Sequence, residues 1–173
     1  SKEDGKVNSK PLVLIVMGSD SDLPVMEEAK AALTSLGIPW RMTIASAHRS
    51  PARVIKLAEE AEAEGIKVII AGAGAAAHLA GVLAAHTTLP VIGVPIDSSP
   101  LRGFDALLST VQMPPGIPVA TVSVGKAGAR NAGILAGEIL GLWDPDIKAG
   151  LERLREDAHR SIEEKAAQIE EQP

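Results

Sequence analysis

The sequence predicts an α/β fold in which helices cover both faces of a five-stranded parallel sheet. Segments rich in apolar or β-branched residues alternate five times with segments of helical spacing. The run at 12–17 is continuously apolar, which is typical of a strand buried on both faces. Of the 173 residues, 46% are hydrophobic, so the chain has enough apolar side chains for a sizeable core.

Strand and helix follow one another in five units along the chain. The expected strands cover residues 12–17, 40–45, 67–71, 91–94 and 119–124. The expected helices follow the strands in turn, over 23–36, 51–64, 76–85, around 105–111 and 127–142. We therefore expect one domain over residues 12–173, preceded by a flexible polar tail at 1–11.

Cap residues support the boundaries of two helices. Asp22 precedes the first helix as its expected N-cap, and Gly37 follows that helix as its expected stop. Ser50 is the expected N-cap of the second helix. Pro51 suits the first helical position, because a missing N–H costs nothing there.

A long last helix is expected over about residues 146–171. Its apolar residues recur every three or four positions and form one stripe, while its other faces carry charge. The stripe comprises Ile147, Leu151, Leu154, Ala158, Ile162, Ala166 and Ile169. Because short helices normally suffice to cover a sheet, we expect this helix to pack on another subunit. Packing on the chain's own sheet is the alternative.

The composition argues against several classes of function. A net charge of −5 with dispersed Lys and Arg argues against a general nucleic-acid binder, which needs a basic stripe. The absence of Cys removes disulfides, thiol catalysis and thiolate metal sites. No apolar run reaches membrane-spanning length and nothing resembles a secretory signal, so we expect a cytoplasmic protein without a membrane partner.

The loops after the strands form the expected ligand-binding edge, because ligands of open parallel sheets bind beyond the carboxyl ends of the strands. The first of these loops, 18–22, offers Ser19 and Asp22 beside a flexible glycine. The alternative explanation for these residues is simply a well-capped helix.

The turn at 46–51 is the stretch around which we expect the rest of the chain to be organised. His48 and Arg49 lie just outside the expected helix start, where unpaired N–H groups and the helix dipole favour an anion. The planar guanidinium of Arg49 matches a phosphate or carboxylate, and a histidine near neutrality beside an anion is a candidate to move protons. A solvated surface turn is the alternative.

The loop at 71–81 is nearly bare of side chains. Its Gly-x-Gly does not fit a dinucleotide fingerprint, which needs the first turn and an acidic residue after the next strand. Such backbone lets a planar ligand lie against peptide N–H groups, and tight helix packing is the alternative. His78 fits either a ligand contact or a hydrogen bond at a helix start. The Pro- and Gly-rich segments 97–103 and 112–118 fit a lid or a subunit contact.

Together, four motifs resemble the signatures of the 5-(carboxyamino)imidazole ribonucleotide mutase family of purine biosynthesis. They are Gly-Ser-Asp-Ser-Asp at 18–22, Ser-Ala-His-Arg-Ser-Pro at 46–51, Ala-Gly-Ala-Gly at 71–74 with Ala-Ala-His-Leu at 76–79, and Val-Gln-Met-Pro at 111–114. The resemblance covers about residues 12–142. It implies a flavodoxin-like three-layer sandwich that assembles into a homo-octamer, with a single catalytic domain and a last helix used for oligomerisation.

The resemblance also implies roles for individual residues. His48 would be the catalytic proton-transfer residue, Arg49 and hydroxyl groups would bind the phosphate of a small ribonucleotide, and Asp22 would bind its ribose. The implied substrate-binding residues are Ser19, Asp22, Ser46, Ala47, Arg49, Gly72, Ala73, Gly74 and His78. The chain departs from the family's common pattern at Ala75, Ala80 and Val82, so we expect its small-residue wall to differ in detailed shape.

The implied reaction moves a carboxylate from an exocyclic nitrogen to the neighbouring ring carbon. One histidine that gives and later takes a proton suffices, and a pocket walled by Gly and Ala would retain the CO2. We expect no cofactor and no metal ion, because the chain has no Walker loop, no biotin-type lysine context and no clustered metal ligands. A direct CO2-dependent aminoimidazole ribonucleotide carboxylase and a non-catalytic flavodoxin-like binding module stay open as alternatives.

Overall fold

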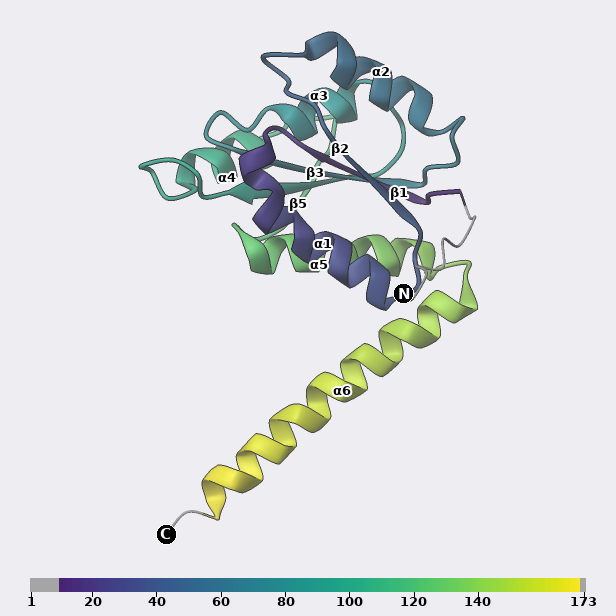
Figure 1. Ribbon diagram of the computed structural model, residues 1–173, viewed down its shortest axis with the longest axis vertical. Helices are drawn as coiled ribbons and strands as arrows, with labels where there is room; N and C mark the ends of the chain where they lie inside the picture. The colour runs from purple at the N-terminus through teal and green to yellow at the C-terminus, as the bar shows by residue number, and fades with distance from the viewer. Residues whose placement is uncertain (1–9, 172–173) are drawn as a thin grey trace, which may run out of the picture.

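The computed structural model describes residues 10–171, in which strands and helices alternate (Figure 1). The strands are β1 Val13–Met17, β2 Trp40–Ile44, β3 Val68–Gly74, β4 Val91–Ile96 and β5 Ala120–Thr121. The helices are α1 Leu23–Ser35, α2 Pro51–Ala61, α3 Leu79–Ala85, α4 Phe104–Val111, α5 Lys126–Leu140 and α6 Pro145–Glu170. A short 3-10 helix, η1, spans Asp20–Asp22.

The five strands are all parallel and lie in the order β2-β1-β3-β4-β5. The chain moves outward from β1 to β2 and then returns across the sheet to β3, so the direction of winding reverses between β1 and β3. The loops that follow β1 and β3 therefore diverge at the carboxyl edge of the sheet. Open parallel sheets bind their ligands at this position.

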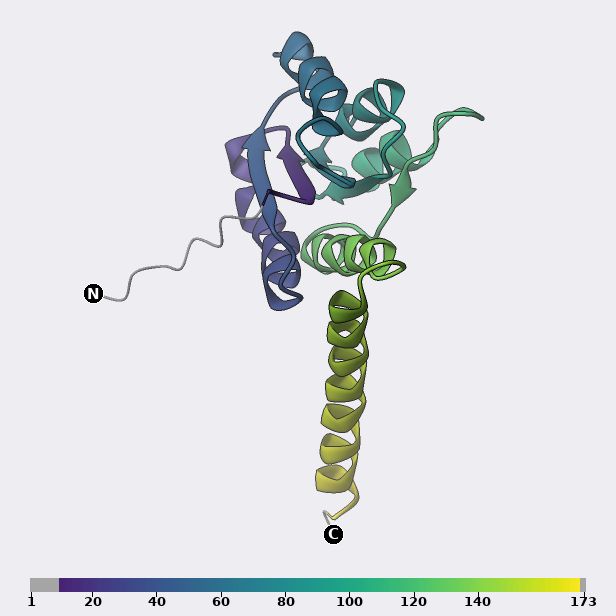
Figure 2. The ribbon, with the colours of Figure 1, turned by 90° about the vertical axis from the view of Figure 1, so that its right-hand side faces the viewer.

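Helices cover the sheet on both faces and bury two apolar cores (Figures 1 and 2). One core lies between the sheet and the pair α1 and α5, and the other lies between the sheet and the pair α2 and α3. Helices α1 and α5 approach closely at Gly133, where a Cβ atom would lie 2.7 Å from the carbonyl oxygen of Ala29. This arrangement confirms the expected three-layer sandwich with a five-stranded parallel sheet.

The strands differ in length from the sequence prediction, most of all β3, β4 and β5, and β4 ends at Ile96 rather than at 94. β3 continues past the expected end at 71 because its last residues pair with β4, where Gly74 is the register partner of Ile96. β5 is limited to Ala120–Thr121, because only these two residues pair with β4.

Helix α3 begins three residues later than the expected start at 76. Ala75 has a left-handed backbone, with φ of 50°, which an α-helix does not accommodate. The N–H group of Ala77 donates to the Ser109 hydroxyl at 3.1 Å. The segment between β3 and α3 is therefore a loop held by α4.

Both predicted N-cap residues occupy the cap position, but neither makes the expected cap bond. The Ser50 hydroxyl accepts from the N–H of Ser46 at 2.9 Å and donates to the Ser46 carbonyl at 3.2 Å. Oδ2 of Asp22 accepts from the N–H of Ser19 at 3.1 Å and makes no bond to α1. Each side chain therefore stabilises the loop that precedes its helix and not the first turn of the helix. Gly37 ends α1 with φ of 70°, as expected.

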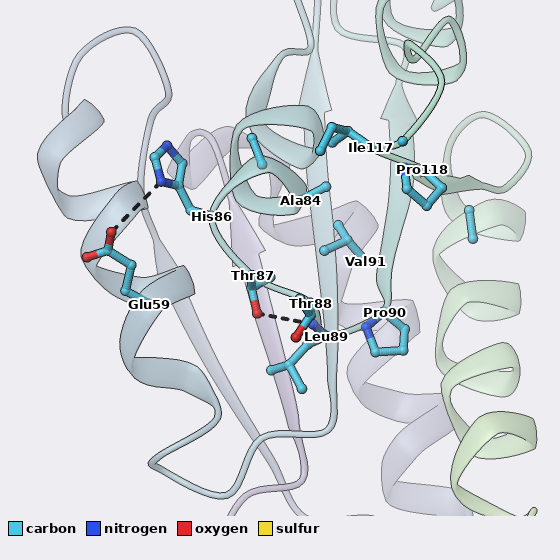
Figure 3. Close-up of a pocket in the computed structure, with 13 residues that line it drawn as sticks. Glu59, Ala84, His86, Thr87, Thr88, Leu89, Pro90, Val91, Ile117 and Pro118 are labelled. Carbon is cyan, nitrogen blue, oxygen red and sulfur yellow. Dashed lines mark hydrogen bonds and ion pairs between the residues drawn. The ribbon is translucent and has the colours of Figure 1, made fainter.

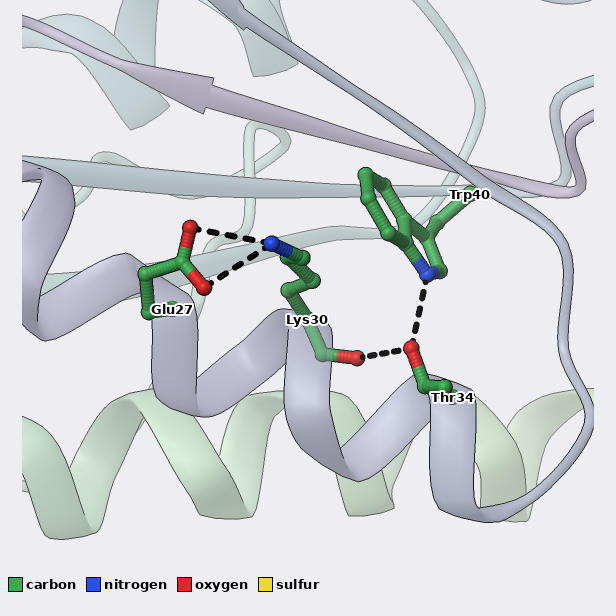
Figure 4. A network of polar contacts seen from close by, with 4 residues as sticks. All are labelled: Glu27, Lys30, Thr34 and Trp40. Atoms are coloured by element: carbon green, nitrogen blue, oxygen red, sulfur yellow. Dashed lines mark hydrogen bonds and ion pairs between the residues drawn. The ribbon is translucent and has the colours of Figure 1, made fainter. Parts of the chain in front are cut away.

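The edge strand β2 is tied to α1 by a small polar network (Figure 4). The indole N–H of Trp40 donates to the Thr34 hydroxyl at 3.0 Å, and that hydroxyl donates to the Lys30 carbonyl at 2.8 Å. The Lys30 ammonium pairs with Glu27 at 2.9 Å and lies 5.4 Å from the centre of the Trp40 ring. Bulky and charged groups at a sheet edge oppose the addition of a foreign strand.

Helix α6 projects away from the rest of the protein (Figures 1 and 2). Ile147 and Leu151 are buried against the core that contains α5, whereas Ile162 is 64% exposed and Ile169 is 70% exposed. The predicted apolar stripe is thus covered only near its start. All but the last two residues of the predicted tail at 1–11 lie outside the described residues. Over residues 10–171, no helix combines the length and apolar content needed to cross a bilayer.

Candidate active site

The loops after β1, β2, β3 and β4 enclose a cavity of about 350 Å³ at the carboxyl edge of the sheet. Its lining contains all the predicted site residues except Gly72 and His78. The lining residues are Gly18, Ser19, Ser21, Asp22, Ser46, Ala47, His48, Arg49, Ala73, Gly74, Ala75, Ala76, Leu79 and Ser98. A cavity of this size fits a small molecule.

The loop after β1 places a buried carboxylate beside two hydroxyl groups. Ser19 and Asp22 form a capping box around η1, and the Ser21 hydroxyl donates to the Ser19 hydroxyl at 3.0 Å. Burial raises the pKa of Asp22 above its ordinary value of 3.8. The N–H of Ser19 and the charge of Arg49 oppose this rise in pKa, while the charge of Asp20 adds to it. Asp22 therefore offers its oxygens to a ligand from a partly desolvated position.

The turn after β2 is held by serine side chains and leaves its cation exposed. The Ser46 hydroxyl accepts from the N–H of Arg49 at 3.1 Å, while the Ser50 hydroxyl binds both backbone groups of Ser46. The Arg49 guanidinium donates through Nη2 to the Gly18 carbonyl at 3.2 Å. Since a guanidinium has five N–H groups, others stay available for an anion in the cavity.

His48 and His78 come together although 30 residues separate them. Nε2 of His48 and Nδ1 of His78 lie 2.9 Å apart, within hydrogen-bond distance. One ring must supply the N–H and the other the lone pair, so this contact fixes the tautomers of both rings relative to each other. His78 is not part of the cavity lining, and it reaches the site through His48.

Gly72 and Gly74 differ in what they contact. A Cβ atom at Gly72 would lie 2.3 Å from Sδ of Met26, so this residue faces the buried core on the side of α1. Gly72 therefore fits the tight-packing alternative for this loop. Gly74 lines the cavity, and a Cβ atom there would lie 1.8 Å from the Ser98 hydroxyl oxygen.

A larger cavity of about 860 Å³ lies at the other edge of the sheet, beside the first residues of β4 and β5 (Figure 3). His86 and Glu59 face each other in its lining, with Nδ1 of His86 3.9 Å from Oε1 of Glu59. It contains none of the predicted site residues. The smaller cavity is the candidate active site, because it gathers a carboxylate, a guanidinium and an imidazole.

The sequence matches a known protein family over most of its length. Residues 12–161 match the family model described as AIR carboxylase. The chain belongs to the AIR carboxylase family. This confirms the family resemblance that the four sequence motifs indicate.

Two relatives and one solved structure match this chain over nearly their whole length. The chain is 57% identical over 164 residues to the N5-carboxyaminoimidazole ribonucleotide mutase of Pyrococcus horikoshii, covering 95% of this chain and 92% of that protein. It is 52% identical over 160 residues to the Bacillus subtilis protein of the same name, covering 92% and 99%. The crystal structure of Treponema denticola PurE is 31% identical, covers 92% of this chain and 98% of that one, and has a TM-score of 0.83.

In this member of the AIR carboxylase family, the cavity also contains residues that sequence reasoning did not single out. Ser98 lies two positions past the end of β4, within a segment that fits a lid or a subunit contact by sequence. Its position just beyond the carboxyl end of a strand was the available signal. Leu79 and Ser21 also line the cavity, although neither is chemically distinctive in the sequence.

Proposed function

We propose that this protein is a mutase that converts 5-(carboxyamino)imidazole ribonucleotide to 4-carboxy-5-aminoimidazole ribonucleotide in purine biosynthesis. The observation that carries the proposal is the paired imidazoles of His48 and His78 beside a cavity that also contains Arg49 and Asp22. Two relatives with more than half of their residues identical are named for this activity.

The charged side of the cavity binds the ribose phosphate in this proposal. Arg49 and the hydroxyls of Ser19 and Ser46 hold the phosphate, because a guanidinium fork and hydroxyl donors match its oxygens. Asp22 accepts hydrogen bonds from the ribose hydroxyls, supported by its cavity-facing position next to Ser19. The imidazole of the substrate then lies toward Ala47, His48 and the loop after β3.

His48 moves one proton in each direction during the reaction. It gives a proton to the exocyclic nitrogen while the bond from that nitrogen to the carboxyl carbon breaks, which releases CO2 and leaves an amino group. The neighbouring ring carbon attacks the CO2, and His48 takes the proton which that carbon loses. The result is an isomer of the substrate with His48 restored to its starting state. His78 keeps the His48 ring in one tautomer.

The neutral side of the cavity holds the CO2 between the two steps. Ala73, Gly74, Ala75 and Ala76 line it, and their small side chains leave the backbone close to the ligand. Retention of CO2 beside the ring carbon makes the second step effectively intramolecular. We propose that the reaction needs no metal or cofactor, since proton transfer and proximity suffice.

The protein acts as a homo-octamer in the cytoplasm in this proposal, and the exposed stripe of α6 packs on another subunit. Large exposed apolar side chains at regular helical spacing support the use of α6 as an interface. Gly72, which the family resemblance implies as a substrate-binding residue, also lies near the substrate in this proposal. Its place is beneath the cavity wall, since it packs on Met26.

A single-turnover assay tests the proposal. Enzyme mixed with 5-(carboxyamino)imidazole ribonucleotide alone should form the 4-carboxy product without ATP, metal or added bicarbonate. With isotopically labelled bicarbonate in the buffer, a mutase that holds its CO2 incorporates little label. A direct carboxylase, the second reading favoured by the family's description, would require added CO2 and incorporate the label fully.

A further inference from the structure

Ser98 presents a hydroxyl group to the cavity from the loop after β4. Ser98 is exposed, and within residues 10–171 its hydroxyl makes no hydrogen bond to another protein group, whereas the neighbouring Ser99 hydroxyl accepts from the N–H of Leu101 at 3.1 Å. The Ser98 side chain lies over Gly74, where any larger residue would collide with it: a Cβ atom at Gly74 would be 1.8 Å from Oγ and 3.0 Å from Cβ of Ser98. Gly74 therefore makes the room in which the Ser98 hydroxyl sits.

The side of the cavity formed by the loops after β3 and β4 is otherwise apolar. The lining residues from these loops and from the first position of α3 are Ala73, Gly74, Ala75, Ala76, Leu79 and Ser98. Among the described residues that line this side, Ser98 alone has a side chain that can donate a hydrogen bond. The charged groups Asp22 and Arg49 come from the loops after β1 and β2, on the other side.

We infer that Ser98 donates a hydrogen bond to the carboxylate of the ligand, which the substrate carries on its exocyclic nitrogen and the product carries on the neighbouring ring carbon. The inference rests on the proposed function, which places the ribose phosphate on the side of Arg49 and so the ring on the side of Gly74. A carboxylate placed against Ala and Gly lacks side-chain donors, and the unpartnered hydroxyl of Ser98 supplies one. Ser98 thereby distinguishes a carboxylated ring from one that has lost its carboxylate.

Calorimetry with Ser98→Ala tests the inference with two ligands. These are 4-carboxy-5-aminoimidazole ribonucleotide and 5-aminoimidazole ribonucleotide, which differ only in the carboxylate. Loss of a hydrogen bond to a charged group should weaken binding of the carboxylated ligand by about 10- to 100-fold. Binding of the other ligand should change by less than about twofold. Ser99→Ala, next in the chain but outside the cavity lining, is the matched control and should leave both affinities unchanged.

Each outcome has a separate meaning. Equal affinities of wild type and Ser98→Ala for the carboxylated ligand would overturn the inference, and so would an equal loss for both ligands. A wild-type protein that binds neither ligand would overturn the proposed function as well. A wild type that binds both ligands but fails to turn over substrate would overturn the proposed function alone, because the difference between the ligands still tests Ser98. A melting temperature equal to that of wild type shows that Ser98→Ala is folded.

Discussion

Nε2 of His48 and Nδ1 of His78 are 2.9 Å apart, with their rings nearly perpendicular at 78° and their centres separated by 5.0 Å. In this geometry a single N–H lies between the two rings, because two would face each other. His48 lines the cavity and His78 lies behind it. We therefore expect His78 to position His48 and to set its tautomer.

The variant His78→Ala should lower kcat by about 5- to 10-fold, the effect of losing one neutral hydrogen bond. It should also change the shape of the pH profile of kcat, because the proton shared by the rings is lost, while KM stays close to wild type. His86→Ala is a matched control, since His86 pairs with Glu59 at the far edge of the sheet. An unchanged kcat and pH profile in His78→Ala would contradict the positioning role.

Asp22→Asn should weaken nucleotide binding and change how the stability of the folded protein depends on pH. Burial is the main cause that raises the pKa of Asp22 in the folded protein above its ordinary value of 3.8. The folded protein therefore binds this proton more tightly than the unfolded chain does, and protonation of Asp22 stabilises the fold. The stabilisation by protonated Asp22 is fully present below pH 3.8 and is lost as the pH rises through the raised pKa. The variant should therefore gain stability relative to wild type as the pH rises through this window, and the difference should then become constant.

Urea unfolding of both proteins at a series of pH values from about 3 to 7 checks this expectation. Glu62→Gln, which removes an exposed carboxylate at the end of α2, is the matched control. The same Asp22→Asn protein should bind nucleotide more weakly, because a ribose contact is lost. A variant that loses stability relative to wild type as the pH rises through this window would contradict the burial argument.

Arg49→Lys retains the charge but loses the planar fork, so it should weaken binding of the product nucleotide by about 10- to 100-fold. The fold should be intact, since among residues 10–171 the guanidinium bonds only to the Gly18 carbonyl. Arg53→Lys is the control, because Arg53 binds Ile44 and Thr43 outside the cavity. Calorimetry on both variants gives the comparison, and unchanged affinity in Arg49→Lys would remove Arg49 from the phosphate site.

Ile162→Asp should weaken the assembly of subunits, because it places a charge in the exposed apolar stripe of α6. Gln168→Asp introduces the same charge on the same helix away from the stripe and should leave assembly intact. Light scattering at micromolar concentration compares the two with wild type. A wild-type monomer, or equal behaviour of the two variants, would count against α6 as an interface.

The regular elements could be predicted because their signals are local. Continuous apolar runs mark the strands, and helical spacing with Gly37 or Pro51 marks the helix ends. The length of β3 was not predictable in this way, since it depends on pairing of Gly74 with Ile96. The late start of α3 depends on a bond from Ala77 to Ser109 on another helix.

The candidate site shows the same division between local and tertiary causes. Positions after the strands located Ser19, Asp22, His48 and Arg49, because the parallel sheet brings these loops to one edge. Contacts across the fold, such as His48 with His78, have no signature in the spacing of the residues. Glycines are equally ambiguous, since only the fold distinguishes a residue that packs on the core from one that lines a cavity.

The proposed mechanism depends on proton transfer by His48, and the variant His48→Asn removes that transfer. Asparagine keeps part of the size and hydrogen bonding of histidine but does not titrate, so nucleotide binding should persist. Turnover of 5-(carboxyamino)imidazole ribonucleotide should fall by about 100- to 10,000-fold, the range of positioned acid–base catalysis. The decisive measurement is the single-turnover rate of this variant at saturating substrate. A rate reduced by this amount with retained product affinity is the predicted result, and a rate equal to that of wild type would contradict the mechanism.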